Sequence, residues 1–156
     1  EKIKAKDFFE EYTAYVADTL GEADIEFIYN FECDEDREIN IDPAQFRRVL
    51  NNLIDNSRKY GAEDGTAKIM LSVRNGENGH TEISIEDNGQ GVPADERDKI
   101  FETFYRGDKA RTGHKNGSGL GLAITKQITD RHGASIRADE SKLGGRKVII
   151  DLPQAK

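Results

Sequence analysis

Residues 42–60 read DPAQFRRVLNNLIDNSRKY, and this stretch predicts the central helix of the fold. It opens with Asp42 as a helix cap, Pro43 at the first helical position and Gln45 placed to reach back to the cap. We expect the helix to run to about Tyr60. At about 100° per residue, one set of positions falls on a single stripe that should pack into the core: Phe46, Val49, Leu50, Leu53, Ile54 and Ser57.

Asn52, Asn56 and Lys59 lie on the flank of this stripe rather than opposite to it. Amide oxygens and an ammonium group at the edge of a core suit a hydrated Mg²⁺ ion and phosphates. The same residues could be ordinary helix-surface positions. Asparagine is a poor helix former, however, so two of them four residues apart favour a functional reason.

The rest of the chain alternates helical and strand-like patterns, which predicts an α+β fold. Residues 7–10 resemble a capping box that starts a helix ending near Gly21. A second long helix is expected over 119–131. Alternating or apolar runs predict the strands 25–31, 67–74, 81–86, 134–138 and 147–152. We expect one domain, residues 1–156, built as a two-layer sandwich: a mixed, mostly antiparallel sheet covered on one face by about three helices, with a mobile lid.

Composition narrows the class of protein. Apolar residues are 35% and charged residues 34% of the 156, which indicates a soluble globular chain. The net charge of −7 argues against nucleic acid as the main partner. Cys33, alone in the sequence, cannot form an internal disulfide and is expected to be a structural, half-buried residue. The chain starts at Glu1 without a methionine, so we expect a fragment of a longer protein.

Residues 116–124 read NGSGLGLAI, with glycines at every second position before a predicted helix. A Rossmann fingerprint needs G-x-G-x-x-G directly after a strand, and a Walker loop needs Gly-Lys-Ser/Thr, so both interpretations fail. Backbone amides at a helix N-terminus still bind anions well. A flexible turn remains the alternative for this stretch taken alone.

The preceding segment, 105–116, has a local charge of +3, which favours a polyanionic ligand over a plain solvated surface. Its charged side chains are Arg106, Lys109, Arg111 and Lys115 against Asp108. Few apolar residues can anchor this segment, so we expect it to be the mobile lid.

Residues 87–91, DNGQG, follow a predicted strand and could be a plain turn. Alternatively, the Asp87 carboxylate could read the edge of a nucleotide base. Ionised Asp only accepts hydrogen bonds, so it would pair with the amine of adenine and repel the carbonyl of guanine.

Together these features resemble the ATP-binding catalytic domain of sensor histidine kinases. NNLIDNSRKY resembles its N box, DNGQG its first glycine box, FETFYR its F box and GSGLGL its second glycine box, in the family's order and over about residues 6–153. The wider superfamily includes gyrase, the large heat-shock chaperone and mismatch-repair ATPases.

The resemblance implies ATP and Mg²⁺ as cofactors. Asn56 would hold Mg²⁺, Asn52 would line the same wall, Lys59 would reach phosphate and Tyr60 would pack near the adenine. Asn56, Lys59 and Arg106 would be the catalytic residues, with Arg106 at the terminal phosphate.

On the base side, the resemblance implies that Asp87 takes the adenine amine, that Gly89 and Gly91 shape the pocket floor, and that Phe104 anchors the lid. The second glycine box would cradle the phosphates through Gly117, Ser118, Gly119, Leu120, Gly121 and Leu122. Ser57 stands where the family usually has alanine. Arg146 and Lys147 stand where an aromatic or threonine-containing strand is usual, which leaves a third glycine element at 144–145 open.

The family's phosphoacceptor is a histidine on a separate dimeric helical hairpin. His80, His114 and His132 lack the surroundings of that histidine, so the chain is expected to be half of an enzyme. The implied partners are the dimerisation/histidine-phosphotransfer domain of the same protein, in a homodimeric parent, and the receiver domain of a response regulator. The implied location is the cytoplasmic side of a protein anchored in a bacterial membrane.

Three alternatives stay open within or beside the superfamily. An ATP-gated clamp would carry a glutamate base four residues before the metal-binding asparagine, where this chain has Asn52, and an amide cannot act as a general base. The others are a self-contained serine kinase of the anti-sigma type and a degenerate module that binds no nucleotide.

Overall fold

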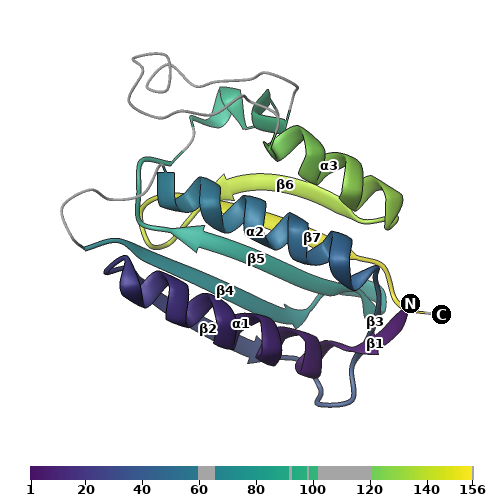
Figure 1. Ribbon diagram of the computed structural model, residues 1–156. Helices are drawn as coiled ribbons and strands as arrows, with labels where there is room; N and C mark the ends of the chain where they lie inside the picture. The colour runs from purple at the N-terminus through teal and green to yellow at the C-terminus, as the bar shows by residue number, and fades with distance from the viewer. Residues whose placement is uncertain (60–65, 92, 98, 102–120, 156) are drawn as a thin grey trace.

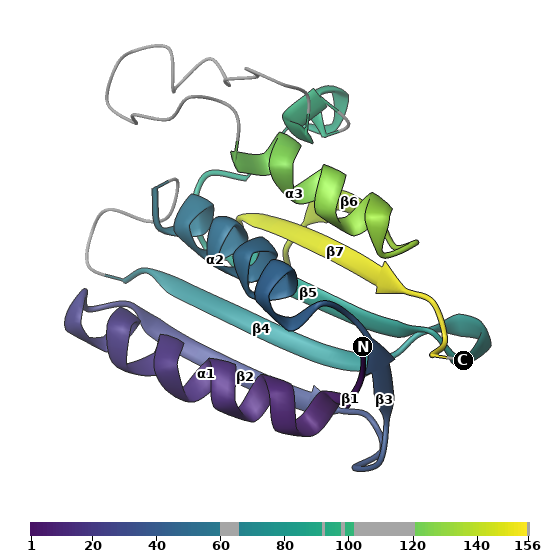
Figure 2. The ribbon, with the colours of Figure 1, turned by 45° about the vertical axis from the view of Figure 1, so that its right-hand side comes forward.

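The computed structural model describes residues 1–59, 66–91, 93–97, 99–101 and 121–155. These residues form two layers, in which three α-helices cover one face of a five-stranded sheet (Figure 1; Figure 2). The helices are α1 (Ala5–Glu22), α2 (Pro43–Lys59) and α3 (Gly121–Arg131). No helix in this described part is both long and apolar enough to span a membrane.

The sheet has the order β2-β4-β5-β7-β6. Its strands are β2 (Glu26–Glu32), β4 (Lys68–Asn75), β5 (Thr81–Asp87), β6 (Ser135–Glu140) and β7 (Arg146–Leu152). β2 pairs with β4 in parallel, and the other neighbours are antiparallel. The predicted mixed, mostly antiparallel α+β architecture is therefore confirmed. Short 3₁₀ helices, η1 (Glu77–Gly79), η2 (Ala94–Glu96) and η3 (Lys99–Phe101), lie in the connections.

A small second sheet, missed from the sequence, pairs β1 (Lys2–Lys4) with β3 (Glu38–Asn40) in antiparallel fashion. Strands of three residues are too short to show alternation. This pairing also sets the start of α1. The helix begins at the fully buried Ala5, whose N–H donates to the carbonyl of Arg37 at 2.9 Å, so the predicted capping box at 7–10 is wrong.

The start of α2 is capped by Asp42 as expected, but the predicted hydrogen bond between the Gln45 side chain and Asp42 is replaced by one between Asp42 and His132. Asp42 Oδ1 accepts from the backbone N–H groups of Ala44 at 3.1 Å and Gln45 at 3.2 Å. Gln45 does not reach back to Asp42. Instead the Asp42 N–H donates to Nε2 of His132 at 3.0 Å, while Nδ1 of His132 lies 2.8 Å from the carbonyl of Ile128. His132 thus joins the start of α2 to the end of α3.

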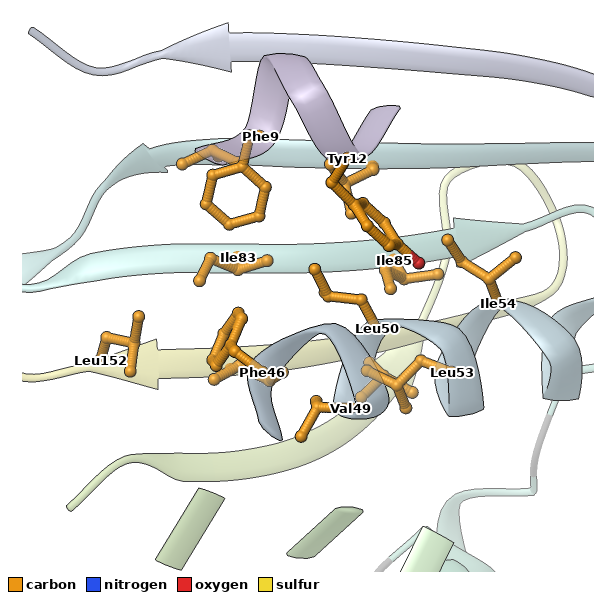
Figure 3. Close-up of a cluster of buried hydrophobic side chains, with 14 of the residues drawn as sticks. Phe9, Tyr12, Phe46, Val49, Leu50, Leu53, Ile54, Ile83, Ile85 and Leu152 are labelled. Carbon is orange, nitrogen blue, oxygen red and sulfur yellow. The ribbon is translucent and has the colours of Figure 1, made fainter. Parts of the chain in front are cut away.

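The core lies between the helices and the sheet (Figure 3). Every residue of the predicted α2 stripe is buried, including Ser57. The stripe packs with Phe9 and Tyr12 of α1 and with Ile83 and Ile85 of β5. Burying each large apolar side chain contributes about 1.5–3 kcal/mol, so this packing fixes how α2 is rotated about its axis.

Candidate functional site

The site residues expected from the sequence fall into two groups. The structure describes Asn52, Asn56, Lys59, Asp87, Gly89, Gly91, Gly121 and Leu122. Outside the described residues lie Tyr60, Phe104, Arg106, Gly117, Ser118, Gly119 and Leu120, together with the predicted lid. The described group gathers at the end of the sheet opposite to the chain termini, where α2 ends, β5 ends and α3 begins (Figure 1).

The flank of α2 supplies one wall of the site. Asn52, Asn56 and Lys59 are all half-buried, as expected for positions beside the apolar stripe. Asn52 Nδ2 lies 3.4 Å both from the carbonyl oxygen of Gly121 and from Oγ1 of Thr125, which ties this wall to the first turn of α3. Lys59 Nζ pairs with the Asp55 carboxylate at 3.3 Å. Pairs this exposed contribute little to stability, so the ammonium group can exchange partners.

The first turn of α3 supplies a second wall. Gly121 is exposed at the helix start, whereas Leu122 is buried and anchors the turn. Oγ1 of Thr125 donates to the carbonyl of Gly121 at 2.9 Å. The backbone N–H groups of a first helical turn have no partner within the helix, and the helix dipole adds positive potential there. This end of α3 therefore suits an anion.

Asp87 forms the floor of the site at the end of β5 and is 2% exposed. Its Oδ1 accepts from the backbone N–H of Gly89 at 3.0 Å and from that of Arg146 at 3.2 Å. Within the described part of the chain, both hydrogen bonds to this carboxylate end on Oδ1, which leaves Oδ2 for an external donor. The following Asn88 holds the loop in place, because its Oδ1 accepts from the Lys68 N–H at 2.8 Å.

The third glycine element, which sequence analysis left open, packs directly on Asp87. A Cβ atom at Gly145 would lie 2.5 Å from the Gly89 nitrogen and 2.6 Å from the Asp87 carbonyl oxygen, and closer still to Asp87 Oδ1. Gly91, at φ +75°, approaches the backbone of Gly145. Only glycine at 145 allows this approach. The pair of glycines at 144–145 was the sequence signal for it.

Arg146 is a further site residue that sequence reasoning missed. It is 7% exposed, and its guanidinium Nη2 donates to Oδ1 of Asn56. Because its backbone N–H holds Asp87, Arg146 connects the floor of the site with the α2 wall. The hydrogen bonds from Asp87 through Arg146 to Asn56 form one continuous path.

The donor set can be tested against a metal ion. The described residues contain no group of three or more His, Cys, Asp or Glu side chains that could hold one. The described residues would therefore give a cation at Asn56 few ligands of their own, and a bound phosphate group and water would have to supply others. Mg²⁺ binds in this manner, so the residues present fit Mg²⁺ held together with a nucleotide.

Cys33 has no role at this site. Burial raises the pKa of its thiol, with the Arg37 charge opposing the rise. A raised pKa keeps the thiol protonated at neutral pH, and nucleophilic attack needs the thiolate. The side chain is half-buried against the core, as expected for a structural cysteine.

A two-layer sandwich that combines a helix start suited to an anion with a buried carboxylate is typical of a nucleotide-binding domain. The family model described as histidine kinase-, DNA gyrase B- and HSP90-like ATPase matches residues 41–156, and the chain belongs to this family.

Similar proteins are named as sensor histidine kinases. WalK of Bacillus subtilis is 40% identical over 132 residues, covering 85% of this chain and 21% of that protein. WalK of Staphylococcus aureus (strain Newman) is 41% identical over 112 residues, covering 72% and 18%. The chain thus spans about a fifth of the length of these curated relatives.

Solved structures share the fold. The mycobacterial sensor histidine kinase MprB superposes with a TM-score of 0.78 at 28% identity, covering 98% of this chain and 96% of that one. Full-length ShkA in complex with AMPPNP gives a TM-score of 0.79 at 22% identity, covering all of this chain and 31% of that one. At that identity, the second likeness concerns the fold alone.

Gly145→Ala tests the close approach at the floor of the site. The added methyl group would force the Asp87 carboxylate or β7 to move. The free energy of unfolding should therefore be about 1–3 kcal/mol lower than that of the wild type. Gly21→Ala is the control, because a Cβ there meets nothing within 4 Å. The Gly21→Ala variant should be as stable as the wild type or up to about 1 kcal/mol more stable. Urea denaturation measures both, and equal stability of Gly145→Ala and the wild type would contradict the packing described.

Proposed function

We propose that this chain, acting as a single domain over residues 1–156, binds Mg²⁺-ATP and donates its γ-phosphate to a histidine on a separate dimerisation domain. The observation that carries the proposal is the continuous connection from Asp87 through Arg146 to Asn56, with Asn52 joining that wall to Gly121. This connection supports the proposal, in which Asp87 would read the base, Asn56 would hold the metal ion and the start of α3 would bind the phosphates.

The phosphate side is proposed to use α2 and α3. Oδ1 of Asn56 would ligate Mg²⁺, which when bound neutralises part of the phosphate charge. Asn52 would line the same wall. Lys59 would leave the exposed Asp55 carboxylate for a phosphate oxygen, a stronger partner for an ammonium group. Gly121 and Leu122 would present the backbone N–H groups of α3 to the phosphates.

The base side is proposed to use the end of β5. Oδ2 of Asp87 would accept from the exocyclic amine of adenine, while Oδ1 keeps its two backbone donors. Gly89 and Gly91 would let the ring approach the loop. The roles of residues outside the described part rest on the sequence resemblance: Tyr60 and Phe104 near the base and lid, Arg106 at the terminal phosphate, and Gly117, Ser118, Gly119 and Leu120 in the cradle.

The phosphoacceptor is proposed to lie on another domain. Of the histidines in the described part, His80 pairs with Asp151 at 3.0 Å and His132 joins two helices, so both serve the fold. His114 lies outside that part. The acceptor would belong to a dimerisation/histidine-phosphotransfer domain of a homodimeric parent, and the phosphate would pass to the receiver domain of a response regulator. The much greater length of the relatives supports such a parent, with this domain on the cytoplasmic side of a membrane anchor.

The ATP-gated clamp is the less favoured alternative. Its water-activating base would have to stand at Asn52, whose amide takes up no proton. The names of the similar proteins also favour the kinase over a clamp or a serine kinase of the anti-sigma type.

Asn56→Ala tests the metal position. Removing the oxygen that holds Mg²⁺ should weaken ATP binding at least tenfold, or abolish its dependence on Mg²⁺, because the phosphate charges would lose their neutralisation. Calorimetry with and without Mg²⁺ gives both values. Arg58→Ala, an exposed change on the same helix, is the control. An unchanged binding curve for Asn56→Ala would remove Asn56 from the site.

The choice of base tests Asp87. GTP should bind more weakly than ATP by roughly 2–3 kcal/mol, because guanine places a carbonyl where adenine has its amine and leaves a buried carboxylate facing another acceptor. Competition against a fluorescent ATP analogue measures the difference. Asp87→Asn, which can donate from its amide, should narrow it. Equal affinities in the wild type would make Asp87 only a turn residue.

A phosphate-transfer assay tests whether the phosphoacceptor histidine lies on a separate domain. Incubated alone with labelled Mg²⁺-ATP, the chain should gain no acid-labile phosphate, because the acceptor is proposed to lie on another domain. Adding the helical hairpin domain of the parent protein should give labelling of that domain, and replacing the hairpin's histidine by alanine should abolish it. Efficient labelling of the isolated chain would instead support a self-contained kinase.

A further inference from the structure

Arg146 is a buried arginine whose position is dictated by β7. Arg146, Val148, Ile150 and Leu152 of this strand are buried on the face that carries the helices. The β5 partners of the last three, Ile85, Ile83 and Thr81, are buried as well. Lys147 points to the opposite face. The Arg146 side chain therefore has to run beneath α2, and it ends at Asn56.

The contact uses the same atom that is proposed to hold the metal. Nη2 of Arg146 donates to Oδ1 of Asn56. A guanidinium and a divalent cation bound to one oxygen would lie within a few ångströms of each other, and like charges that close repel strongly in a partly buried site. Asn56 can serve one or the other.

We propose that Arg146 occupies Asn56 Oδ1 in the nucleotide-free protein and competes with Mg²⁺ for it, so that Arg146 sets the Mg²⁺ concentration at which ATP binds. This inference rests on the proposed function of the site. The backbone of Arg146 stays fixed, because its N–H is held by Asp87 and Gly145 N–H donates to the Asp87 carbonyl at 3.1 Å. Asn56 can then be released by a turn of the Arg146 side chain while the backbone stays in place.

The proposed competition with Mg²⁺ depends on the positive charge of the side chain at position 146. An uncharged side chain at position 146 could not act as a cationic competitor. Mg²⁺ can bind only to the molecules in which Arg146 has turned away from Asn56. The apparent affinity for Mg²⁺ is therefore the intrinsic affinity multiplied by the fraction of molecules in that state. Removing the guanidinium removes this penalty.

Arg146→Met and Lys147→Met form a matched pair of variants. Both remove one positive charge and keep an unbranched stem, but only the first touches Asn56. At a fixed ATP concentration, the Mg²⁺ concentration that half-saturates ATP binding should fall roughly tenfold in Arg146→Met, the size expected when one charge-assisted hydrogen bond no longer competes. It should stay within about twofold of the wild type in Lys147→Met. An unchanged midpoint in Arg146→Met overturns the proposal.

A second measurement detects the contact itself. In ¹⁵N-labelled, nucleotide-free protein, the side-chain amide resonances of Asn56, assigned by their loss in Asn56→Ala, should shift in Arg146→Met and not in Lys147→Met. Unmoved resonances in Arg146→Met also overturn the proposal. If Arg146→Met fails to fold, Arg146→Gln keeps a polar end at this buried position without the charge, and it should shift the Mg²⁺ midpoint in the same direction.

Failure of this inference and failure of the proposed function give different results. If ATP binding by the wild type does not depend on Mg²⁺ or on Asn56, the proposed function fails. If both dependences hold and Arg146→Met keeps the wild-type midpoint, only the competition is wrong.

Discussion

The packing of α2 on the sheet is the constraint on which the site depends. One stripe of this helix is buried against β5 and α1, and the free energy of that burial fixes the rotation of the helix. Residues next to the stripe are then carried to the edge of the core. Asn52 and Asn56 face the site for this reason, because no other rotation buries the stripe.

The geometry of Asp87 at the floor of the site depends on the lack of a side chain at Gly145. Asp87 is buried, and a buried carboxylate is costly unless donors hold it. Two backbone N–H groups do so, and one of them reaches Oδ1 only because Gly145 has no Cβ. Pairing of β5 with β7 brings these segments together across about 60 residues of sequence, as the register of Glu86 with Lys147 requires. Sheet register therefore determines the geometry around the carboxylate.

Sequence patterns predicted those features of the fold that depend on interactions between residues close together in the sequence. The cap at Asp42, the proline after it and the 3.6-residue period located α2 and its buried face. Alternating or apolar runs located the five strands of the main sheet. The errors all come from contacts between distant residues. His132 replaces Gln45 as partner of the Asp42 N–H, and Arg146 reaches Asn56, each across 90 positions. Periodicity contains no information about such contacts, and the short strands β1 and β3 exist only through each other.

The charge of the site explains how an acidic chain can accept a polyanion. The protein carries a net charge of −7, so its cations must be held close to the ligand. Among the described residues, Lys59 is paired with Asp55 and Arg146 with Asn56. Both side chains are thus already positioned by partners before a ligand arrives. In the proposed function, Lys59 would exchange the Asp55 carboxylate for a phosphate oxygen, so little additional side-chain entropy would be lost. The two contacts of the nucleotide-free site thus have opposite proposed effects: the Asp55 pair would keep the Lys59 ammonium near the phosphates, and the Asn56 contact would keep the Arg146 guanidinium at the metal position.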